Sequence, residues 1–155
     1  MFNIVLHQPR MPGNVGTVGR LAYALDCTLH LIKPYGFGDI TEKQVRRAGL
    51  DYWFELDVRE YDDIEDFWQK NPFNEQHYFA TTKTEQTYFD AQFKPGDYLY
   101  FGREDKGLPQ DILNKREASA ITIPMTNNAR SLNMANAVSI VAYEALRQNL
   151  SEFKG

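Results

Sequence analysis

Residues 123–148, IPMTNNARSLNMANAVSIVAYEALRQ, run from the end of an apolar segment through a polar turn into a long apolar helix. The apolar segment is typical of a buried strand, and it ends at Pro124. Small polar residues follow, which favour turns and helix caps. Ser131 is the predicted N-cap of a helix that extends to about residue 149. Polar turns of this kind also form ligand-binding loops at the end of a parallel sheet. The turn is therefore either a cap or one wall of a binding site.

Segments with strand and helix character alternate through the rest of the chain. Strands are predicted at residues 2–7, 28–34, 52–58, 77–82, 97–102 and 120–124, and helices at 14–26, 41–49, 61–70, 108–115 and 131–149. This alternation predicts an α/β fold with a mainly parallel sheet flanked by helices. The sequence has no internal repeat and no linker-like segment, so a single domain over residues 1–155 is expected.

The composition is that of a soluble globular protein, with 43% hydrophobic and 25% charged residues among 155. The formal net charge of −4 argues against nucleic-acid binding through overall charge, but a local basic patch is compatible with it. No apolar run approaches the roughly 20 residues that cross a bilayer, and the N-terminus lacks the basic start of a signal peptide. We therefore expect a cytoplasmic protein without a membrane partner.

Residues that commonly bind metals are few and scattered. Cys27 is the only cysteine, which excludes an internal disulfide and a CxxC metal site, and it is interpreted as a small core residue. His7, His30 and His77 each fall inside a predicted strand, where a hydrogen-bonded core or edge histidine is the expected role. No metal site is predicted.

Three loops at the predicted carboxyl ends of strands have an unusual composition: residues 9–20, PRMPGNVGTVGR, residues 101–109, FGREDKGLP, and the turn after Pro124. Ligands of parallel α/β sheets bind at this edge. The glycine spacing of the first loop does not match a dinucleotide fingerprint, and close helix packing is the expected reason for these glycines. In the second loop, Glu104 and Asp105 can cap a helix, bind a hydroxyl or contact a basic partner.

Basic residues cluster in one predicted helix turn, at Lys43, Arg46 and Arg47. Such a cluster is either a solvated helix face or a phosphate contact. Arginines also occur in each of the three loop regions, and they can extend the same patch: Arg10, Arg20 and Arg130.

Taken together, the segments PGNVGTVGR (12–20), LYFGREDKGLP (99–109) and 123–148 resemble the three motifs of the SPOUT class of RNA methyltransferases. The resemblance is greatest to the small, single-domain tRNA 2′-O-methyltransferases that act on the wobble nucleotide, and it includes RRAGLDY (46–52) and FATTK (79–83). It implies a parallel α/β sheet whose C-terminal part is tied in a deep trefoil knot, a rare exception among folds. It also implies S-adenosyl-L-methionine as cofactor, tRNA as partner, a homodimer and no metal.

The resemblance implies a role for individual residues. The cofactor site would comprise Ala80, Thr81, Phe101, Gly102, Glu104, Gly107, Ile123, Met125, Ser131, Leu132 and Asn133. Arg20 matches the catalytic arginine, which faces the cofactor of the other protomer. Contacts to RNA are expected from Asn14, Arg46, Arg47, Arg130 and Tyr143.

The last helix carries an apolar stripe, which is either core or part of the dimer interface: Leu132, Ala135, Val138 and Ala142. Three functions stay open at this point. The leading one is 2′-O-ribose methylation of the wobble nucleotide in the tRNA anticodon loop. The alternatives are a SPOUT methyltransferase that acts on another RNA, such as rRNA, and a non-catalytic RNA-binding module with the same fold.

Overall fold

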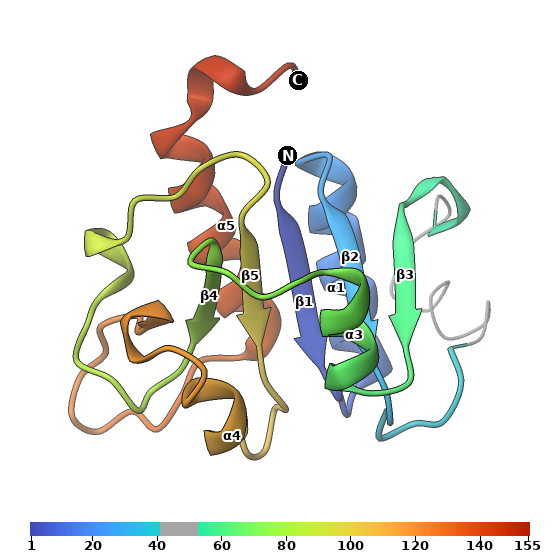
Figure 1. Ribbon diagram of the computed structural model, residues 1–155, viewed down its shortest axis with the longest axis horizontal. Coiled ribbons are helices and arrows are strands. Elements are labelled where there is room, and N and C mark those ends of the chain that lie inside the picture. The colour runs from blue at the N-terminus through green and yellow to red at the C-terminus, as the bar shows by residue number, and fades with distance from the viewer. Residues whose placement is uncertain (41–52) are drawn as a thin grey trace.

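The computed structural model describes residues 1–40 and 53–155, which form a sheet of six parallel strands in the order β3-β2-β1-β5-β4-β6. The strands are β1 (Asn3–His7), β2 (Thr28–Ile32), β3 (Val58–Tyr61), β4 (His77–Ala80), β5 (Tyr98–Phe101) and β6 (Ala120–Ile121). All carboxyl ends therefore lie at one edge of the sheet, the lower edge in Figure 1.

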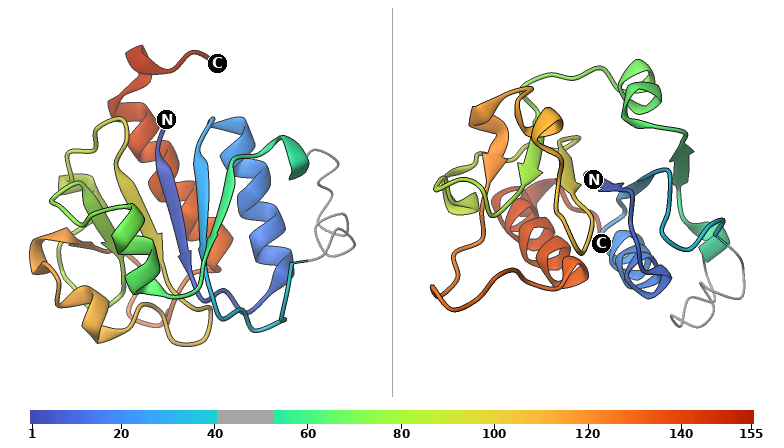
Figure 2. Two further views of the ribbon diagram at one scale, coloured as in Figure 1. Left: turned by 45° about the vertical axis from the view of Figure 1, so that its right-hand side comes forward. Right: turned by 90° about the horizontal axis from the view of Figure 1, so that it is seen from below.

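Helices cover both faces of the sheet (Figures 1 and 2). Helices α1 (Pro12–Ala24) and α5 (Met134–Gln148) lie side by side on one face and pack against each other. Helices α3 (Ile64–Lys70) and α4 (Gln110–Leu113) lie on the other. Because strand side chains alternate between faces, Ile4 and Leu6 join the core under α1 and α5, while Val5 joins the core under α3 and α4. The α/β prediction is confirmed, and the trefoil knot stays a prediction.

Several predicted boundaries were wrong, and local hydrogen bonding explains two of them, the starts of α5 and α3. Helix α1 begins at Pro12, two residues before the predicted start at residue 14, because a proline ring favours the first helical position. Helix α5 begins at Met134, because the Asn133 side chain and not that of Ser131 accepts the free N–H of Asn136, at 3.1 Å. Periodicity does not distinguish two polar residues this close together.

The third error concerns the predicted strand at 52–58. Residues Trp53–Glu55 form a 3₁₀ turn, and the strand that pairs with β2 is β3, further along the chain. The acidic helix then begins later than expected, at Ile64, because the Asp63 carboxylate accepts the N–H of Asp66 at 2.7 Å. The helix predicted at 41–49 lies outside the described residues.

The single cysteine and the three histidines are buried, as the sequence predicts. His30 lies 2.9 Å from the Tyr61 hydroxyl and 2.8 Å from Asn3 Oδ1, and His77 Nδ1 lies 2.6 Å from the Tyr100 hydroxyl. Burial lowers the pKa of each of the three imidazoles to about 4, because it disfavours the charged form.

Buried neutral histidines make stability depend on pH. Between pH 6.5 and about 4, unfolded imidazoles take up protons that the native ones do not, so stability falls as the pH falls through this window. Burial raises the pKa of Asp97 to about 6, which gives a smaller effect of opposite sign. We expect a lower urea midpoint at pH 5.0 than at pH 7.5, because the free energy of unfolding falls by about 2 kcal/mol for each imidazole.

His77→Gln removes one titrating imidazole, so the difference between its two midpoints should be smaller than in the wild type. Equal midpoints for the wild type at both pH values would contradict the buried neutral state of these histidines.

Candidate functional site

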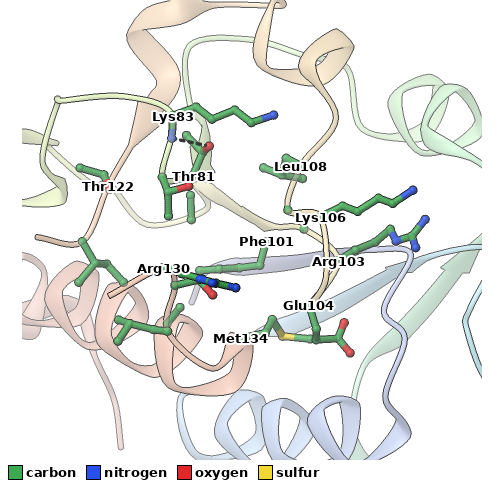
Figure 3. A pocket seen from close by; sticks show the side chains of 18 of the residues that line it. Thr81, Lys83, Phe101, Arg103, Glu104, Lys106, Leu108, Thr122, Arg130 and Met134 are labelled. Carbon is green, nitrogen blue, oxygen red and sulfur yellow. Dashed lines mark hydrogen bonds between the residues drawn. The ribbon is translucent and has the colours of Figure 1, made fainter. Parts of the chain in front are cut away.

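A cavity of about 370 Å³ opens at the carboxyl edge of β4, β5 and β6 (Figure 3). Three segments line it: residues 80–83 after β4, residues 101–108 after β5, and parts of residues 121–137, which include the first turn of α5. Apolar side chains such as Phe101, Leu108 and Met134 form part of the wall, together with the backbone of the loop after β5. The cavity lies where parallel α/β sheets bind ligands.

The loop after β5 is folded tightly onto itself. A Cβ atom on Gly102 would lie 2.1 Å from the carbonyl carbon of Gly107 and 2.1 Å from the nitrogen of Leu108. The Gly107 N–H donates to the Arg103 carbonyl at 2.7 Å, and Gly107 has a φ of +71°, a conformation that favours glycine. Both glycines are therefore required for this loop shape.

Glu104 joins this loop to the start of α1. Its carboxylate accepts the N–H of Arg10 at 3.0 and 3.1 Å and the N–H of Met11 at 2.7 Å. Met11 directly precedes α1, so a negative charge lies at the positive end of the helix dipole. The sequence allows several roles for Glu104, and in the structure its carboxylate holds the segment before α1 and also lines the cavity.

A second connection joins α1 to α5. Asn133 caps α5 with its Oδ1 and directs its Nδ2 to Asn14 Oδ1, at 3.4 Å. The first and third motifs are therefore in contact, although 119 residues separate them in the sequence. This contact holds the start of α5 beside the first turn of α1, which contains Asn14.

The cavity carries an excess of positive charge. Glu104 is occupied by backbone N–H groups, and Asp105 is paired with Arg103 at 2.8 Å. The other charged side chains of the lining are Lys83, Lys106 and Arg130, which form no ion pair with any described residue. A chain with a formal charge of −4 thus presents a locally basic site.

Ten of the eleven residues predicted to bind the cofactor line this cavity, and the exception is Asn133, which caps α5. The sequence did not single out several other lining residues, among them Lys83, Leu108, Thr122 and Met134. They lie beside predicted residues in the same segments, so the signal was their proximity in the sequence to those residues. Arg130, predicted to contact RNA, also lines the cavity.

The other predicted residues lie elsewhere. Arg20 is exposed on α1 and does not line the cavity of its own chain. Tyr143 is half exposed on α5. Arg46 and Arg47 lie outside the described residues. The stripe on α5 belongs to the protomer's own core at its three buried positions, Ala135, Val138 and Ala142, so these side chains offer no surface to a partner.

Within residues 1–40 and 53–155, no group of three or more histidine, cysteine, aspartate or glutamate side chains is arranged to hold a metal ion. In the same part of the chain, no helix is long and apolar enough to span a membrane.

The sequence model of the SpoU rRNA methylase family matches residues 1–143, which include all three segments around the cavity. The chain belongs to this family. Among its SpoU relatives, the tRNA (cytidine(34)-2′-O)-methyltransferase of Escherichia coli K12 is 43% identical, over 96% of this chain and 94% of that protein. A putative enzyme of the same name from Listeria monocytogenes is 42% identical, over 94% of this chain and 87% of that protein.

Solved structures of SpoU-like methyltransferases have the same fold. One of them, solved for insight into the 2-OH methylation of C/U34 on tRNA, superposes on this chain with a TM-score of 0.90 at 41% identity. The match covers 97% of this chain and 97% of that one. An AdoMet-bound rRNA methyltransferase from Sinorhizobium meliloti gives a TM-score of 0.82 at 26% identity, over 94% of this chain and 56% of that one.

Gly102→Ala tests the tight loop of this SpoU methylase. The new methyl group meets backbone atoms that cannot move without opening the loop, so we expect a loss of about 1–3 kcal/mol in stability, measured by urea unfolding. The matched control is Gly13→Ala in α1, where a Cβ meets nothing within 4 Å. This control should be neutral or slightly stabilising. Equal effects of the two substitutions would show that the loop is not sterically constrained.

Proposed function

We propose that this chain is an S-adenosyl-L-methionine-dependent enzyme that methylates the ribose 2′-hydroxyl of the wobble nucleotide, position 34, in the tRNA anticodon loop. The observation that carries this proposal is the cavity at the carboxyl edge of the sheet, which is lined by residues 80–83 and by parts of the second and third motifs. Relatives that match almost the whole chain at about 40% identity bear the name of this activity. The rRNA enzyme from Sinorhizobium meliloti is more distant, at 26% identity, which favours tRNA over rRNA as substrate.

The residues present fit the cofactor. The cavity volume, about 370 Å³, lies in the range of small-molecule sites. Phe101, Ile121 and Leu108 offer apolar surface for an adenine ring, and the glycines at 102 and 107 bring backbone groups within reach of a ligand. When bound, S-adenosyl-L-methionine supplies a methyl group that its sulfonium already activates.

The protein then has to position the 2′-hydroxyl in line with that methyl group and to stabilise the charge that develops on the oxygen. Arg20 is the residue proposed for this task. A guanidinium keeps its proton in proteins, so Arg20 would orient a phosphate of the nucleotide and stabilise the developing alkoxide, without acting as the base.

The position of Arg20 supports a homodimer with shared active sites. Arg20 does not line the cavity of its own chain, and it is exposed on α1. A second copy that packs on the α1 and α5 side would bring Arg20 of one protomer to the cavity of the other. Tyr143, half exposed on α5, would lie on the same side of the sheet.

The surface around the cavity suits an RNA loop. Lys83 and Lys106 line the cavity without an ion pair in the described part of the chain and would bind phosphates. Tyr143 and Asn14 would contact the target nucleotide, since splayed-out loop bases are read by stacking and by edge contacts. Arg46 and Arg47 are proposed to contribute further phosphate contacts. A tRNA substrate also agrees with the proposed cytoplasmic location.

The first test is cofactor binding without metal. Isothermal titration calorimetry should show the same dissociation constant for S-adenosyl-L-methionine with and without EDTA, because the described part of the chain offers no metal-ligand cluster. Binding that disappears with the chelator, or no binding at all, would overturn the proposed function.

The second test concerns Arg20. Arg20→Ala should keep cofactor affinity but lower the methylation rate of tRNA by about 10²–10³-fold, the usual cost of one lost transition-state donor. Arg20→Lys should recover little, because a point charge replaces a planar fork. Near-wild-type methylation rates for both variants would show that Arg20 is a surface residue without a role in the reaction.

Mixed dimers test whether the sites are shared. Arg20→Ala protomers are combined with Ser131→Trp protomers, in which the cofactor cavity is filled. If Arg20 serves the partner's cavity, each mixed dimer regains one working site. Mixtures that remain inactive would place Arg20 and the cavity in the same protomer.

A further inference from the structure

We propose that Arg130 binds the carboxylate of the cofactor's amino-acid tail, so that the cavity selects nucleosides that carry this carboxylate over those that lack it. The proposal rests on the proposed function, and it assigns Arg130 to the cofactor instead of to RNA, the role that the sequence predicts.

The first argument is the balance of charge in the cavity. Its two acidic side chains are already used, Glu104 by the N–H groups of Arg10 and Met11, and Asp105 by Arg103. The cationic side chains that remain in the lining make no ion pair with described residues: Lys83, Lys106 and Arg130. A sulfonium alone would be repelled by such a lining. A carboxylate on the same ligand gives one of these cations a specific partner.

The second argument is direction. In Figure 3 the side chains of Lys106 and Arg103 extend away from the cavity, to the right of the view. The Arg130 side chain extends from the segment before α5 toward the middle of the cavity, on the side of Phe101 and Met134. The Lys83 side chain runs along the upper part of the view, so Arg130 is the cation of the lining that is directed toward a ligand on the side of Phe101 and Met134.

The third argument is that the backbone on both sides of Arg130 is held. The Ala129 N–H donates to the Thr126 carbonyl at 3.1 Å, which closes a turn just before Arg130. Three residues after it, Asn133 caps α5 and contacts Asn14. Because the backbone is held on both sides of Arg130, less backbone freedom is lost when its side chain binds a ligand. The planar guanidinium can also donate two parallel hydrogen bonds to a carboxylate.

The experiment compares two nucleosides that differ only in the carboxylate. S-adenosylhomocysteine has it, and its decarboxylated analogue, S-adenosyl-3-thiopropylamine, does not. Calorimetry should show that the wild type prefers S-adenosylhomocysteine by about 10- to 100-fold, the range of a hydrogen-bonded charge pair. In Arg130→Ala this preference should fall to near one, because affinity for S-adenosylhomocysteine drops while affinity for the analogue hardly changes. Arg130→Lys should restore part of it.

Lys106→Ala is the matched control, since it removes an equal charge from the same lining. It should keep the preference for the carboxylate. Equal loss of preference in Lys106→Ala and Arg130→Ala would mean that the overall positive charge of the lining attracts the carboxylate and no single residue binds it. The proposal would then be wrong. If Arg130→Ala lowers the affinity for both nucleosides equally, Arg130 stabilises the turn and does not bind the carboxylate, and the proposal would be wrong.

One result would show that Arg130 contacts RNA and not the cofactor. In that case Arg130→Ala would bind S-adenosylhomocysteine with wild-type affinity and preference, yet bind tRNA more weakly. A wild type that binds neither nucleoside would contradict the proposed function itself, an outcome distinct from a wild type that binds both and ignores the carboxylate.

Discussion

The site depends on one close backbone contact, in which Gly102 lies against Gly107 and Leu108 with no room for a side chain. This contact folds the loop after β5 back on itself and directs two side chains in opposite directions. Leu108 is buried in the core under α3 and α4. Glu104 reaches the N–H groups that precede α1. One steric constraint therefore connects the end of β5 to both layers of helices.

The hydrogen bonds that fix the site also determine its charge. Each carboxylate at the edge of the cavity is committed to holding the loops in place, Glu104 to backbone N–H groups and Asp105 to Arg103. Arg103 is paired with Asp105, but Lys83, Lys106 and Arg130 form no ion pair within the described part of the chain. A protein with a net negative charge can therefore present a basic site, because the carboxylates at the cavity bind groups of the surrounding loops while three cationic side chains there remain without an ion pair in the described part of the chain.

Helices α1 and α5 connect the cavity to the proposed shared site. They pack against each other, and Asn14 and Asn133 join their first turns. The start of α5 is therefore in direct contact with the helix that carries Arg20. In a homodimer of the proposed kind, the cofactor loop of one protomer and the catalytic arginine offered to the other would be rigidly coupled, since they lie on two helices in direct contact.

The sequence by itself determined the class of fold and the composition of the site. Alternating periodicities predict the parallel α/β sheet, and ten of the eleven residues predicted to bind the cofactor lie around one cavity in the structure. Local chemistry did not determine where helices begin, because Ser131 and Asn133 are equally good caps until one of them meets Asn136. Tertiary structure alone decided what each charge does. Glu104 is a ligand residue, a cap or a surface acid depending on what lies beside it, and residues 10 and 11 come beside it only when β1 and β5 pair. Arg130 likewise points to a cofactor or to RNA according to the direction of a turn, which follows from packing across the sheet and not from neighbours in the sequence.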